Sequence, residues 1–384
     1  MRNFLLTIII IFTSLILLGG CGKKEVQKVY PEGVRGVWLT NVDSDVLSSK
    51  KNIEDAVKLC KESGINAIFC VVWNKAVTMY PSKVMKDLFG VEIDTLYIGR
   101  DPLKELIEEA HKSGIKVFAW FEFGFSSSYN LNGGHLLEKK PHWKSLDSKG
   151  NLLKKNNFEW MNAFHPEVQE FMISLVTEVV RNYNVDGIQG DDRLPALPSE
   201  GGYDEFTVNL YKEAHNGAAP PVDSKDSAWV QWRADLLTAF LGRLYDSVKS
   251  VNKNCIVSMS PSVYPWSLEE YLQDWPLWVE KGYVELVCPQ LYRYNIDAYR
   301  KVLNEAYNEQ IPADKRNILY PGVLLKVGSY YPDEGFLHDM ILANREKGIT
   351  GEVFFFYEGL KKYPTFFDSK IYSDTIVFPD LLRD

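Results

Sequence analysis

The sequence predicts an α/β fold, a (β/α)8 TIM barrel with long strand-to-helix loops on the face at the C-terminal ends of its strands. Eight apolar strand patterns alternate with helix patterns along the chain. Such alternation is typical of a parallel sheet covered by helices, and eight repeats favour a closed barrel. A doubly wound open sheet is the alternative, although that fold rarely uses eight regular repeats.

The strand patterns are short apolar runs, and the helix patterns between them repeat apolar residues at three and four positions. Gly64 ends the first helix, Pro102 opens the second and Gly114 ends it, and Pro166 opens the third. Strands are expected at 34–40, 67–73, 115–121, 186–190, 256–260, 284–292, 318–325 and 352–357, and the later helices at 228–251, 267–280, 296–308 and 335–347.

Loop lengths indicate which face of the predicted barrel is functional. Connections from helix to strand are mostly tight, whereas three connections from strand to helix are long, at 74–100, 123–164 and 193–227. Long loops on one face only indicate a functional face. The barrel is expected to cover residues 34–360, and 361–384 are expected to form a C-terminal extension packed on it.

The N-terminus has the pattern of a bacterial lipoprotein signal. Arg2 precedes an apolar run that ends in Leu18-Gly19-Gly20-Cys21. A positive start, an apolar stretch and small residues before a cleavage point make a secretory signal. We expect residues 1–20 to be the signal peptide, Cys21 to be lipidated, and residues 21–33 to act as a tether to the membrane. An uncleaved anchor with a chance cysteine is the alternative.

The composition argues against several functions. The net charge of −8 opposes a nucleic-acid surface. The six histidines have no short metal-binding spacing, and no nucleotide-binding or serine-hydrolase motif is present, so the sequence predicts no cofactor and no metal. Buried free thiols are expected at Cys60, Cys70, Cys255 and Cys288, with disulfide pairing as the alternative.

The stretch from Asp186 to Arg193 carries the strongest chemical signal. A buried strand ends there in the adjacent carboxylates Asp191 and Asp192, and barrels present catalytic groups at such strand ends. Because side chains alternate along a strand, Asp191 is expected to point into the barrel and Asp192 away from it, where Asp192 pairs with Arg193. A pair of acids that only caps the loop or holds the arginine is the alternative.

A glycosidase needs two carboxyl groups, one of which protonates the glycosidic oxygen. Neighbouring residues on one strand face opposite ways, so the partner of Asp191 should come from another strand. Glu122, after the third strand, and Glu358, after the eighth, are the candidates, with Asp192 as a further acid at the same rim.

Aromatic and polar side chains at the strand ends predict a cleft that binds sugars. Trp and Tyr supply flat faces on which sugar rings stack, and amides and cations supply hydrogen bonds. The substrate-binding residues expected from the strand ends are Trp38, Trp73, Trp120, Gln189, Arg193, Gln290, Tyr292, Tyr294 and Tyr357.

Several stretches together resemble the glycosyl-hydrolase-like 10 family of bacterial lipoproteins and secreted proteins. They are Arg35-Gly-Val-Trp-Leu-Thr40, Ala119-Trp-Phe-Glu122, Asn162-Ala-Phe-His-Pro-Glu167, Val185-Asp-Gly-Ile-Gln-Gly-Asp-Asp192 and Pro289-Gln-Leu-Tyr292. The resemblance covers about residues 35–360 and implies a TIM barrel that acts on glycans; some relatives are implicated in cleaving peptidoglycan strands. It carries over to Asp191 more securely than to Glu122, because relatives have Asn at that position.

The leading interpretation is a lipid-anchored glycoside hydrolase of the cell envelope that acts on the extracytoplasmic side, with peptidoglycan strands as one candidate substrate. A non-catalytic glycan-binding lipoprotein with the same cleft is the first alternative. A hydrolase of non-glycan substrates, such as a deacetylase, is the second, but it needs a metal site that the sequence lacks.

Overall fold

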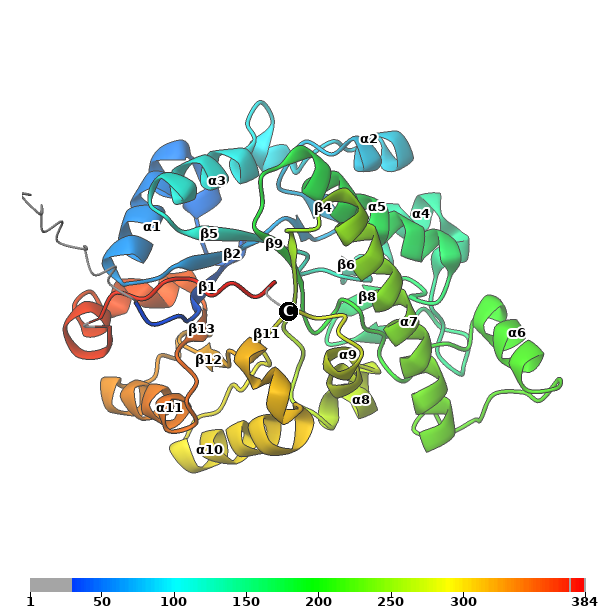
Figure 1. Cartoon of the computed structure of the whole chain (residues 1–384). Coiled ribbons are helices and arrows are strands. Elements are labelled where there is room, and N and C mark those ends of the chain that lie inside the picture. The colour runs from blue at the N-terminus through cyan, green and yellow to red at the C-terminus, as the bar shows by residue number, and fades with distance from the viewer. Residues whose placement is uncertain (1–29, 373, 383–384) are drawn as a thin grey trace, which may run out of the picture. The chain divides into compact units, whose positions relative to one another are not determined.

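The computed structural model describes residues 30–372 and 374–382, so the predicted signal peptide and Cys21 lie outside the described residues. From residue 31 onward the chain forms one compact unit built on a curled, eight-stranded parallel sheet surrounded by helices (Figure 1). The strands lie in the order β11-β10-β9-β5-β2-β1-β13-β12. Their bounds are β1 (Arg35–Leu39), β2 (Ala67–Val71), β5 (Lys116–Trp120), β9 (Gly187–Gly190), β10 (Ile256–Met259), β11 (Leu286–Val287), β12 (Gly322–Leu324) and β13 (Glu352–Phe355).

Each of the eight strands falls inside one predicted strand pattern, but β11 and β12 are much shorter than expected. Pro289 and Pro321 lie in these two patterns, and proline has no N–H to donate to a ladder. Beside these edge strands the pairing continues only as two isolated parallel bridges, Val287 with Leu319 and Gln290 with Gly322.

The helices that follow the strands cover the outer side of the sheet. In α3, for example, Pro102 occupies the first turn, the Asp101 carboxylate accepts from the Lys104 N–H, and the apolar face predicted from the sequence is buried. The helices of this layer are α1 (Lys50–Glu62), α3 (Pro102–Lys112), α5 (Pro166–Asn182), α7 (Ser227–Val251), α8 (Trp266–Tyr271), α9 (Trp275–Glu280), α10 (Ile296–Glu305), which continues into the π-helical turn η4 (Ala306–Gln310), η5 (Ala313–Ile318) and α11 (Glu334–Glu346).

The three long strand-to-helix loops contain structure that the sequence patterns do not reveal, because strands of two to four residues show no periodicity. The first holds β3 (Trp73–Asn74), β4 (Val77–Thr78), α2 (Lys83–Phe89) and η2 (Thr95–Tyr97). The second holds the antiparallel sheet β6-β8-β7 (Ser126–Tyr129, Phe158–Trp160, Lys154–Lys155), α4 (Gly134–Lys139) and η3 (Pro141–Trp143), and the third holds α6 (Glu205–Ala214).

The C-terminal segment lies against the N-terminal ends of the strands. Val377 forms a parallel bridge with Glu32 and exchanges backbone hydrogen bonds with Pro31 and Gly33. The guanidinium of Arg35 lies over the Tyr372 ring, 3.9 Å from its centroid. The remaining short helical turns are η1 (Val46–Ser48), η6 (Tyr357–Lys362) and η7 (Phe367–Ile371).

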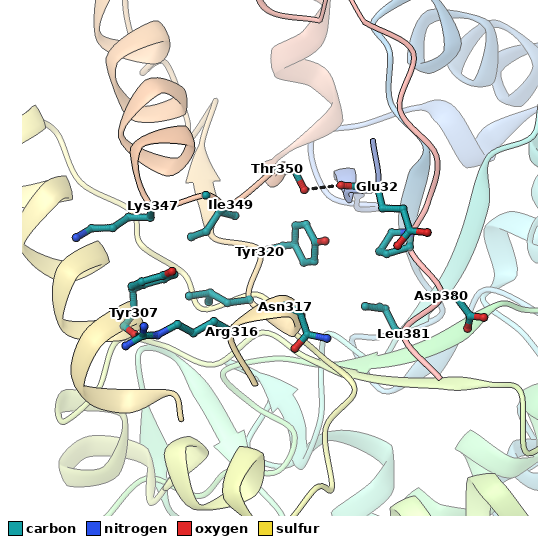
Figure 2. Close-up of a pocket in the computed structure, with 13 residues that line it drawn as sticks. Glu32, Tyr307, Arg316, Asn317, Tyr320, Lys347, Ile349, Thr350, Asp380 and Leu381 are labelled. Atoms are coloured by element: carbon teal, nitrogen blue, oxygen red, sulfur yellow. Dashed lines mark hydrogen bonds between the residues drawn. The ribbon is translucent and has the colours of Figure 1, made fainter. Parts of the chain in front are cut away.

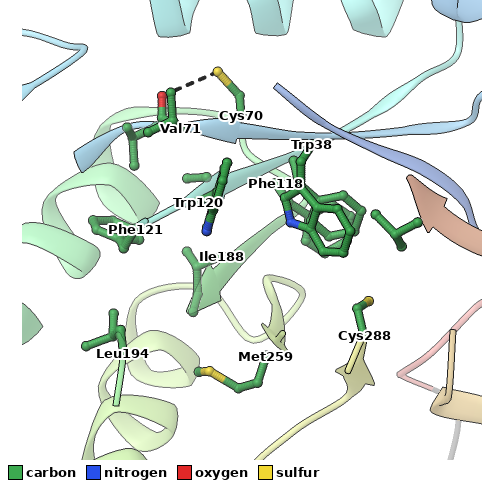
Figure 3. Packing of buried hydrophobic residues seen from close by; sticks show 14 of the residues in the cluster. Trp38, Cys70, Val71, Phe118, Trp120, Phe121, Ile188, Leu194, Met259 and Cys288 are labelled. Carbon is green, nitrogen blue, oxygen red and sulfur yellow. Dashed lines mark hydrogen bonds between the residues drawn. The ribbon is translucent and has the colours of Figure 1, made fainter. Parts of the chain in front are cut away.

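The inside of the curled sheet is filled with large rings (Figure 3). Trp38 lies 5.9 Å from Phe69 and 6.5 Å from Trp120, and Phe69 stacks on Phe118 at 4.7 Å. The four cysteines expected to be buried free thiols are free and buried. Within residues 30–372 and 374–382, no helix has the length and apolar character needed to cross a membrane.

Candidate active site

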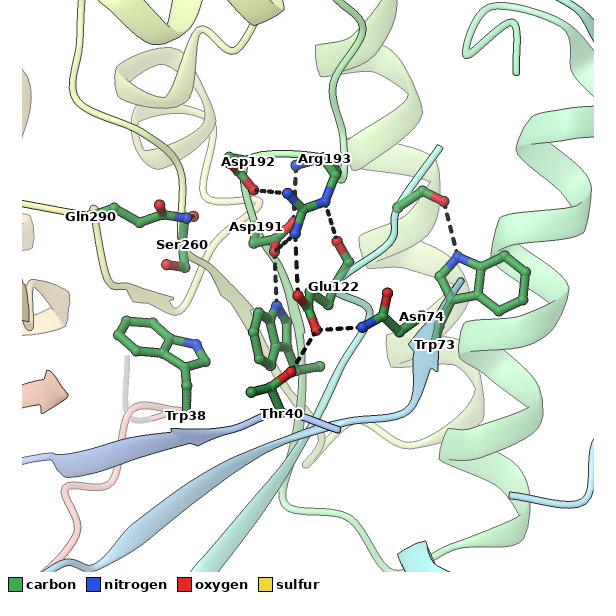
Figure 4. A network of polar contacts seen from close by, with 12 residues as sticks. Trp38, Thr40, Trp73, Asn74, Glu122, Asp191, Asp192, Arg193, Ser260 and Gln290 are labelled. Carbon is green, nitrogen blue, oxygen red and sulfur yellow. Dashed lines mark hydrogen bonds and ion pairs between the residues drawn. The ribbon is translucent and has the colours of Figure 1, made fainter. Parts of the chain in front are cut away.

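A polar network lies where β1, β3, β5 and β9 end, on the face that carries the long loops (Figure 4). Asp191 follows β9 directly, and Glu122 follows β5 with one residue between. The backbone of the two loops meets at Gly124, whose φ is +51° and where an added Cβ would lie 2.0 Å from the Arg193 carbonyl oxygen. A glycine is therefore required there for Arg193 and Glu122 to come together.

Arg193 is the centre of this network. Its Nη2 lies 3.3 Å from an Asp191 carboxylate oxygen and 3.6 Å from a Glu122 oxygen, and its Nη1 lies 3.3 Å from Asp192. Its Nε donates to the backbone carbonyl of Glu122 at 2.7 Å, and Phe158 packs on the guanidinium at 4.8 Å. Three carboxylates thus share one cation that is fixed on several sides.

Asp191 is the most deeply buried acid of the three, with 2% of its side chain exposed. It points inward, as the alternation along β9 predicts, and accepts hydrogen bonds from Trp120 Nε1 at 3.1 Å and from the Arg193 N–H at 2.9 Å. Burial raises the pKa of Asp191 well above its ordinary value; Arg193 opposes this shift, and the negative charges of Asp192 and Glu122 add to it.

Glu122 is more accessible, with 17% of its side chain exposed. Thr40 donates to its carboxylate at 3.2 Å and Asn74 Nδ2 donates at 3.0 Å. The orientation of the Asn74 amide is set by its oxygen, which accepts from the Lys75 N–H at 2.8 Å. Burial raises the pKa of Glu122, while Arg193 and the Thr40 hydrogen bond act in the opposite direction.

Asp192 pairs with Arg193 as expected, but it does not point away from the mouth. Its side chain is 28% exposed, the largest fraction of the three acids. Its charge contributes to the raised pKa values of Tyr292 and Tyr271, after burial, which is the main cause. The turn that follows β9 ends the strand alternation before Asp192, so the alternation rule no longer sets its direction.

The structure does not bring Glu358 into this network. Glu358 lies in η6, where it accepts from Ser44 at 2.9 Å and pairs with Lys361 at 2.6 Å. Tyr357 is buried, and Cys60, Asp45 and Asp55 are among the groups whose charges act on its hydroxyl, so it faces α1 and the loop before it. Neither residue adjoins Asp191, because η6 turns the chain away after β13.

Four residues expected to bind substrate are packed inside the fold. Trp38 donates to Gln189 at 2.6 Å, and Gln189 donates to Ser258 at 2.9 Å, all within the buried interior. Trp120 is buried and holds Asp191, and Trp73 donates to the Gly124 carbonyl oxygen at 3.0 Å, away from the carboxylates (Figure 4). The three tryptophans are buried, so their rings lack a free face for a sugar.

Three other predicted binding residues do reach the surface at this face. Gln290 donates to the Ser260 carbonyl oxygen at 3.0 Å, and Tyr292 packs on Phe355 with ring centroids 5.3 Å apart. Burial, followed by the charges of Asp192 and Asp191, raises the pKa of Tyr292 well above its ordinary value. Tyr294 is largely exposed.

Thr40, Asn74 and Phe355 were not predicted as parts of the site. All three lie at the ends of strands on the loop-rich face, so the signal that identified Glu122 also applied to Thr40 and Asn74. In the described part of the chain, no group of three or more His, Cys, Asp or Glu residues is placed to hold a metal ion.

A separate cavity of about 310 Å³ lies at the opposite ends of the strands (Figure 2). Its lining includes Tyr320 and Thr350, which precede β12 and β13, together with Tyr307, Arg316 and Asp380. None of the residues predicted for catalysis or substrate binding lines this cavity.

Comparisons with known proteins identify the family of this chain. Residues 33–324 match the family model described as Glycosyl hydrolase-like 10. "Glycosyl hydrolase DigH" of Escherichia coli (strain K12) is 26% identical over 325 residues, covering 77% of this chain and 70% of that protein. "Glycosyl hydrolase YngK" of Bacillus subtilis (strain 168) is 22% identical over 393 residues, covering 91% of this chain and 73% of that protein.

Two solved structures have a similar fold. The PgaB (BpsB) glycoside hydrolase domain from Bordetella bronchiseptica has a TM-score of 0.67 at 14% identity and covers 91% of this chain and 100% of that domain. The catalytic domain of beta-amylase from Paenibacillus polymyxa has a TM-score of 0.62 at 11% identity, with 90% and 100% covered. Because the family model spans most of the chain, this protein belongs to the Glycosyl hydrolase-like 10 family.

Proposed function

We propose that this protein is a glycoside hydrolase that cleaves a glycan of the cell envelope, with Asp191 as the proton-transferring carboxyl group and Glu122 as its partner. The observation that carries the proposal is that Asp191, Glu122 and Asp192 share the single guanidinium of Arg193 at the C-terminal ends of the strands. The repulsion within this group, together with burial, supports a carboxyl group that keeps its proton near neutral pH.

In the proposed reaction, Asp191 gives its proton to the glycosidic oxygen as the bond to the anomeric carbon breaks. In one route Glu122 bonds to that carbon, and water then replaces Glu122 while giving a proton back to Asp191. In the other route Glu122 takes a proton from the water that attacks the carbon directly. Both carboxylates contact Arg193 Nη2, at 3.3 and 3.6 Å. Carboxyl pairs of glycosidases are separated by about 5 Å in retaining enzymes and by about 6.5–9.5 Å in inverting ones. Because the carboxylates of Asp191 and Glu122 both contact Arg193 Nη2, the shorter separation is favoured.

The closed (β/α)8 barrel belongs to this proposal as well. The two isolated bridges between the segments beside β11 and β12 support closure, and the similar glycoside hydrolase domains support it further. Peptidoglycan strands are the candidate substrate because the predicted lipoprotein signal directs the chain to the envelope.

A second candidate function, glycan binding without hydrolysis, is favoured by one observation. The carboxylate of Asp191 is almost completely buried and accepts from Trp120 and Arg193, which satisfies much of its hydrogen-bonding capacity. In that alternative the acids position Arg193, and Arg193 with Tyr292 contacts the sugar.

Turnover of peptidoglycan glycan strands by purified protein distinguishes the two candidates. We expect Asp191→Asn to reduce turnover at least about a hundredfold, with little loss of stability, and Asp192→Asn to have a smaller effect. Glu358→Gln is the matched control, because it removes a carboxylate of the same face outside the network. Equal turnover in wild type and Asp191→Asn, or loss only in Asp192→Asn, contradicts the assignment; glycan binding with no turnover by wild type supports the second candidate.

We further propose that Cys21 carries the lipid that attaches the protein to the envelope membrane on its extracytoplasmic side. Stable attachment needs two acyl chains or an equivalent second signal, which a lipoprotein modification supplies. Cys21→Ser is expected to release the protein into the soluble fraction or to stall its processing. A wild-type protein that fractionates as soluble, without lipid mass on its N-terminus, contradicts this proposal.

A further inference from the structure

Tyr294 and Tyr330 form an aromatic surface on the same loop-rich face as the acid network. Tyr294 follows Tyr292 by two residues in the loop between β11 and α10, and Tyr330 lies in the loop between β12 and α11. Their rings meet edge to face, with centroids 4.9 Å apart. Tyr294 is 66% exposed, more than any other aromatic side chain within residues 30–372 and 374–382.

These rings border a hollow of about 610 Å³ with a mixed lining. Ile296, Tyr331 and Phe336 supply further apolar surface, and Asp339 supplies an exposed carboxylate. Ligand sites combine apolar and aromatic walls with a few polar groups. A sugar ring has the matching chemistry, because its C–H face packs on an aromatic ring while its hydroxyl groups donate to carboxylates.

Hydrogen bonds order the backbone at or beside both tyrosines. Asn295, next to Tyr294, caps α10 by accepting from the Ala298 N–H at 2.9 Å. Tyr330 closes a tight turn in which it exchanges backbone hydrogen bonds with Val327 at 2.9 and 3.2 Å. A preordered surface loses less conformational freedom on binding than a mobile one.

The position of this surface connects it to the proposed cleft. Gln290 and Tyr292 lie beside the acids, and the chain leads from them to Tyr294 within two residues. The loops after β11 and β12 emerge from the same ends of the sheet as the loop with Asp191 (Figure 1). A glycan chain with its reacting bond at Asp191 therefore reaches Tyr294 when the chain extends across the loops after β11 and β12.

We propose that Tyr294 and Tyr330 form a secondary sugar-binding site, which holds a unit of the glycan away from the bond that is cleaved. The substrate is then a chain of several linked sugars rather than a short oligosaccharide. This inference rests on the proposed glycosidase function, and it adds a binding site that the reaction itself does not require.

The test compares long peptidoglycan glycan strands with the shortest fragments of the same strands that the wild type cleaves. Tyr294→Ala is expected to raise KM for long strands about tenfold, the size of one lost aromatic contact, and to leave kcat unchanged. The same variant should cleave the short fragments as the wild type does. Tyr294→Phe keeps the ring and should behave like wild type, and Leu342→Ala removes an exposed apolar side chain on α11 as a matched control.

Sedimentation with insoluble glycan strands gives a second readout that does not depend on turnover. Tyr294→Ala with wild-type KM and wild-type glycan binding overturns the secondary site while the glycosidase proposal stands. Equal losses on long and short substrates also overturn it, because they place Tyr294 at the reacting bond. Wild-type protein that neither binds nor cleaves the strands contradicts the proposed function itself.

Discussion

The two ends of the sheet both hold buried carboxylates beside arginine, and they differ in how the charges balance. At the N-terminal ends, Glu352 of β13 is fully buried, and Arg345 of α11 donates to both of its oxygens at 2.9 and 3.0 Å. Tyr372 and Asn344 donate further hydrogen bonds to it. Arg345 holds this carboxylate in bidentate geometry, the strongest form of such a pair, and the charge of Arg35 also interacts with it.

At the C-terminal ends the carboxylates outnumber the arginine that they contact. Three carboxylates, those of Asp191, Asp192 and Glu122, share the one guanidinium of Arg193 at 3.3 to 3.6 Å. Their negative charges exceed the positive charge, and burial raises the pKa of Asp191 further. Solvent reaches this end through Asp192, Glu122 and Arg193, which are partly exposed.

The comparison separates a structural cluster from a candidate catalytic one that uses the same residue types. The Arg345–Glu352 pair joins β13, α11 and the C-terminal segment through hydrogen bonds and is closed to solvent at the carboxylate. An excess of carboxylates around one cation favours the protonated form of a carboxyl group, which is the form that the proposed reaction needs. Charge balance and access to solvent, rather than the presence of buried acids, therefore distinguish the two clusters.

Removal of the arginine should affect mainly stability at the N-terminal ends and mainly turnover at the C-terminal ends. The largest loss of stability is expected at the N-terminal ends. Arg345→Met leaves Glu352 buried without its partner, which should lower the free energy of unfolding by about 3 kcal/mol. Turnover per folded molecule should not change, since Arg345 is remote from the acids. Urea denaturation and turnover of glycan strands measure the two quantities.

Arg193→Met is the matched variant at the other end. Two of its three carboxylates, Glu122 and Asp192, are partly exposed to water, so the loss of stability should be smaller than for Arg345→Met, whereas turnover should fall. If Arg193→Met is the less stable variant and its folded fraction keeps full turnover, Arg193 is a structural residue and the contrast between the two ends is wrong.

The strands and the inward direction of Asp191 were predictable from the sequence. The apolar repeats predict all eight strands, and the alternation along β9 predicts that Asp191 points inward. The same rule also places Trp38 and Trp120 inward, yet it does not distinguish a ring that lines a cleft from one that fills the core. That distinction depends on how far the opposite strands fill the interior, which is a three-dimensional property.

The loops were the less predictable part. Asn74 reaches Glu122 because the β3–β4 hairpin turns at Lys75 and Ala76, whose φ values of 49° and 61° are unusual for residues other than glycine. Glu358 looked equivalent to Glu122 in the sequence, but η6 directs it to Ser44 and Lys361. Partners that come from different loops are set by tertiary contacts that no local pattern encodes.

The pH dependence of stability provides a more sensitive test of the excess negative charge. A carboxyl group whose pKa is raised by folding stabilises the native state fully below its unfolded pKa, about 3.9 for Asp, and this stabilisation is lost as pH rises through the folded pKa. Burial raises the pKa of Asp191 in this way. The Tm of wild type should therefore fall relative to that of Asp191→Asn as pH increases from about 4 toward neutral.

The absolute difference in Tm at any one pH also includes hydrogen bonds that asparagine changes, so the trend with pH is the quantity to measure. The protonated form of Asp191 is the one that donates to the glycosidic oxygen, so kcat should decline on the alkaline side over the same pH range in which the Tm difference changes. A Tm difference that stays constant with pH, or that moves in favour of wild type as pH rises, would mean that Asp191 is ionised in the folded protein. The proposed difference in charge between the Arg193 cluster and the Arg345–Glu352 pair would then be wrong.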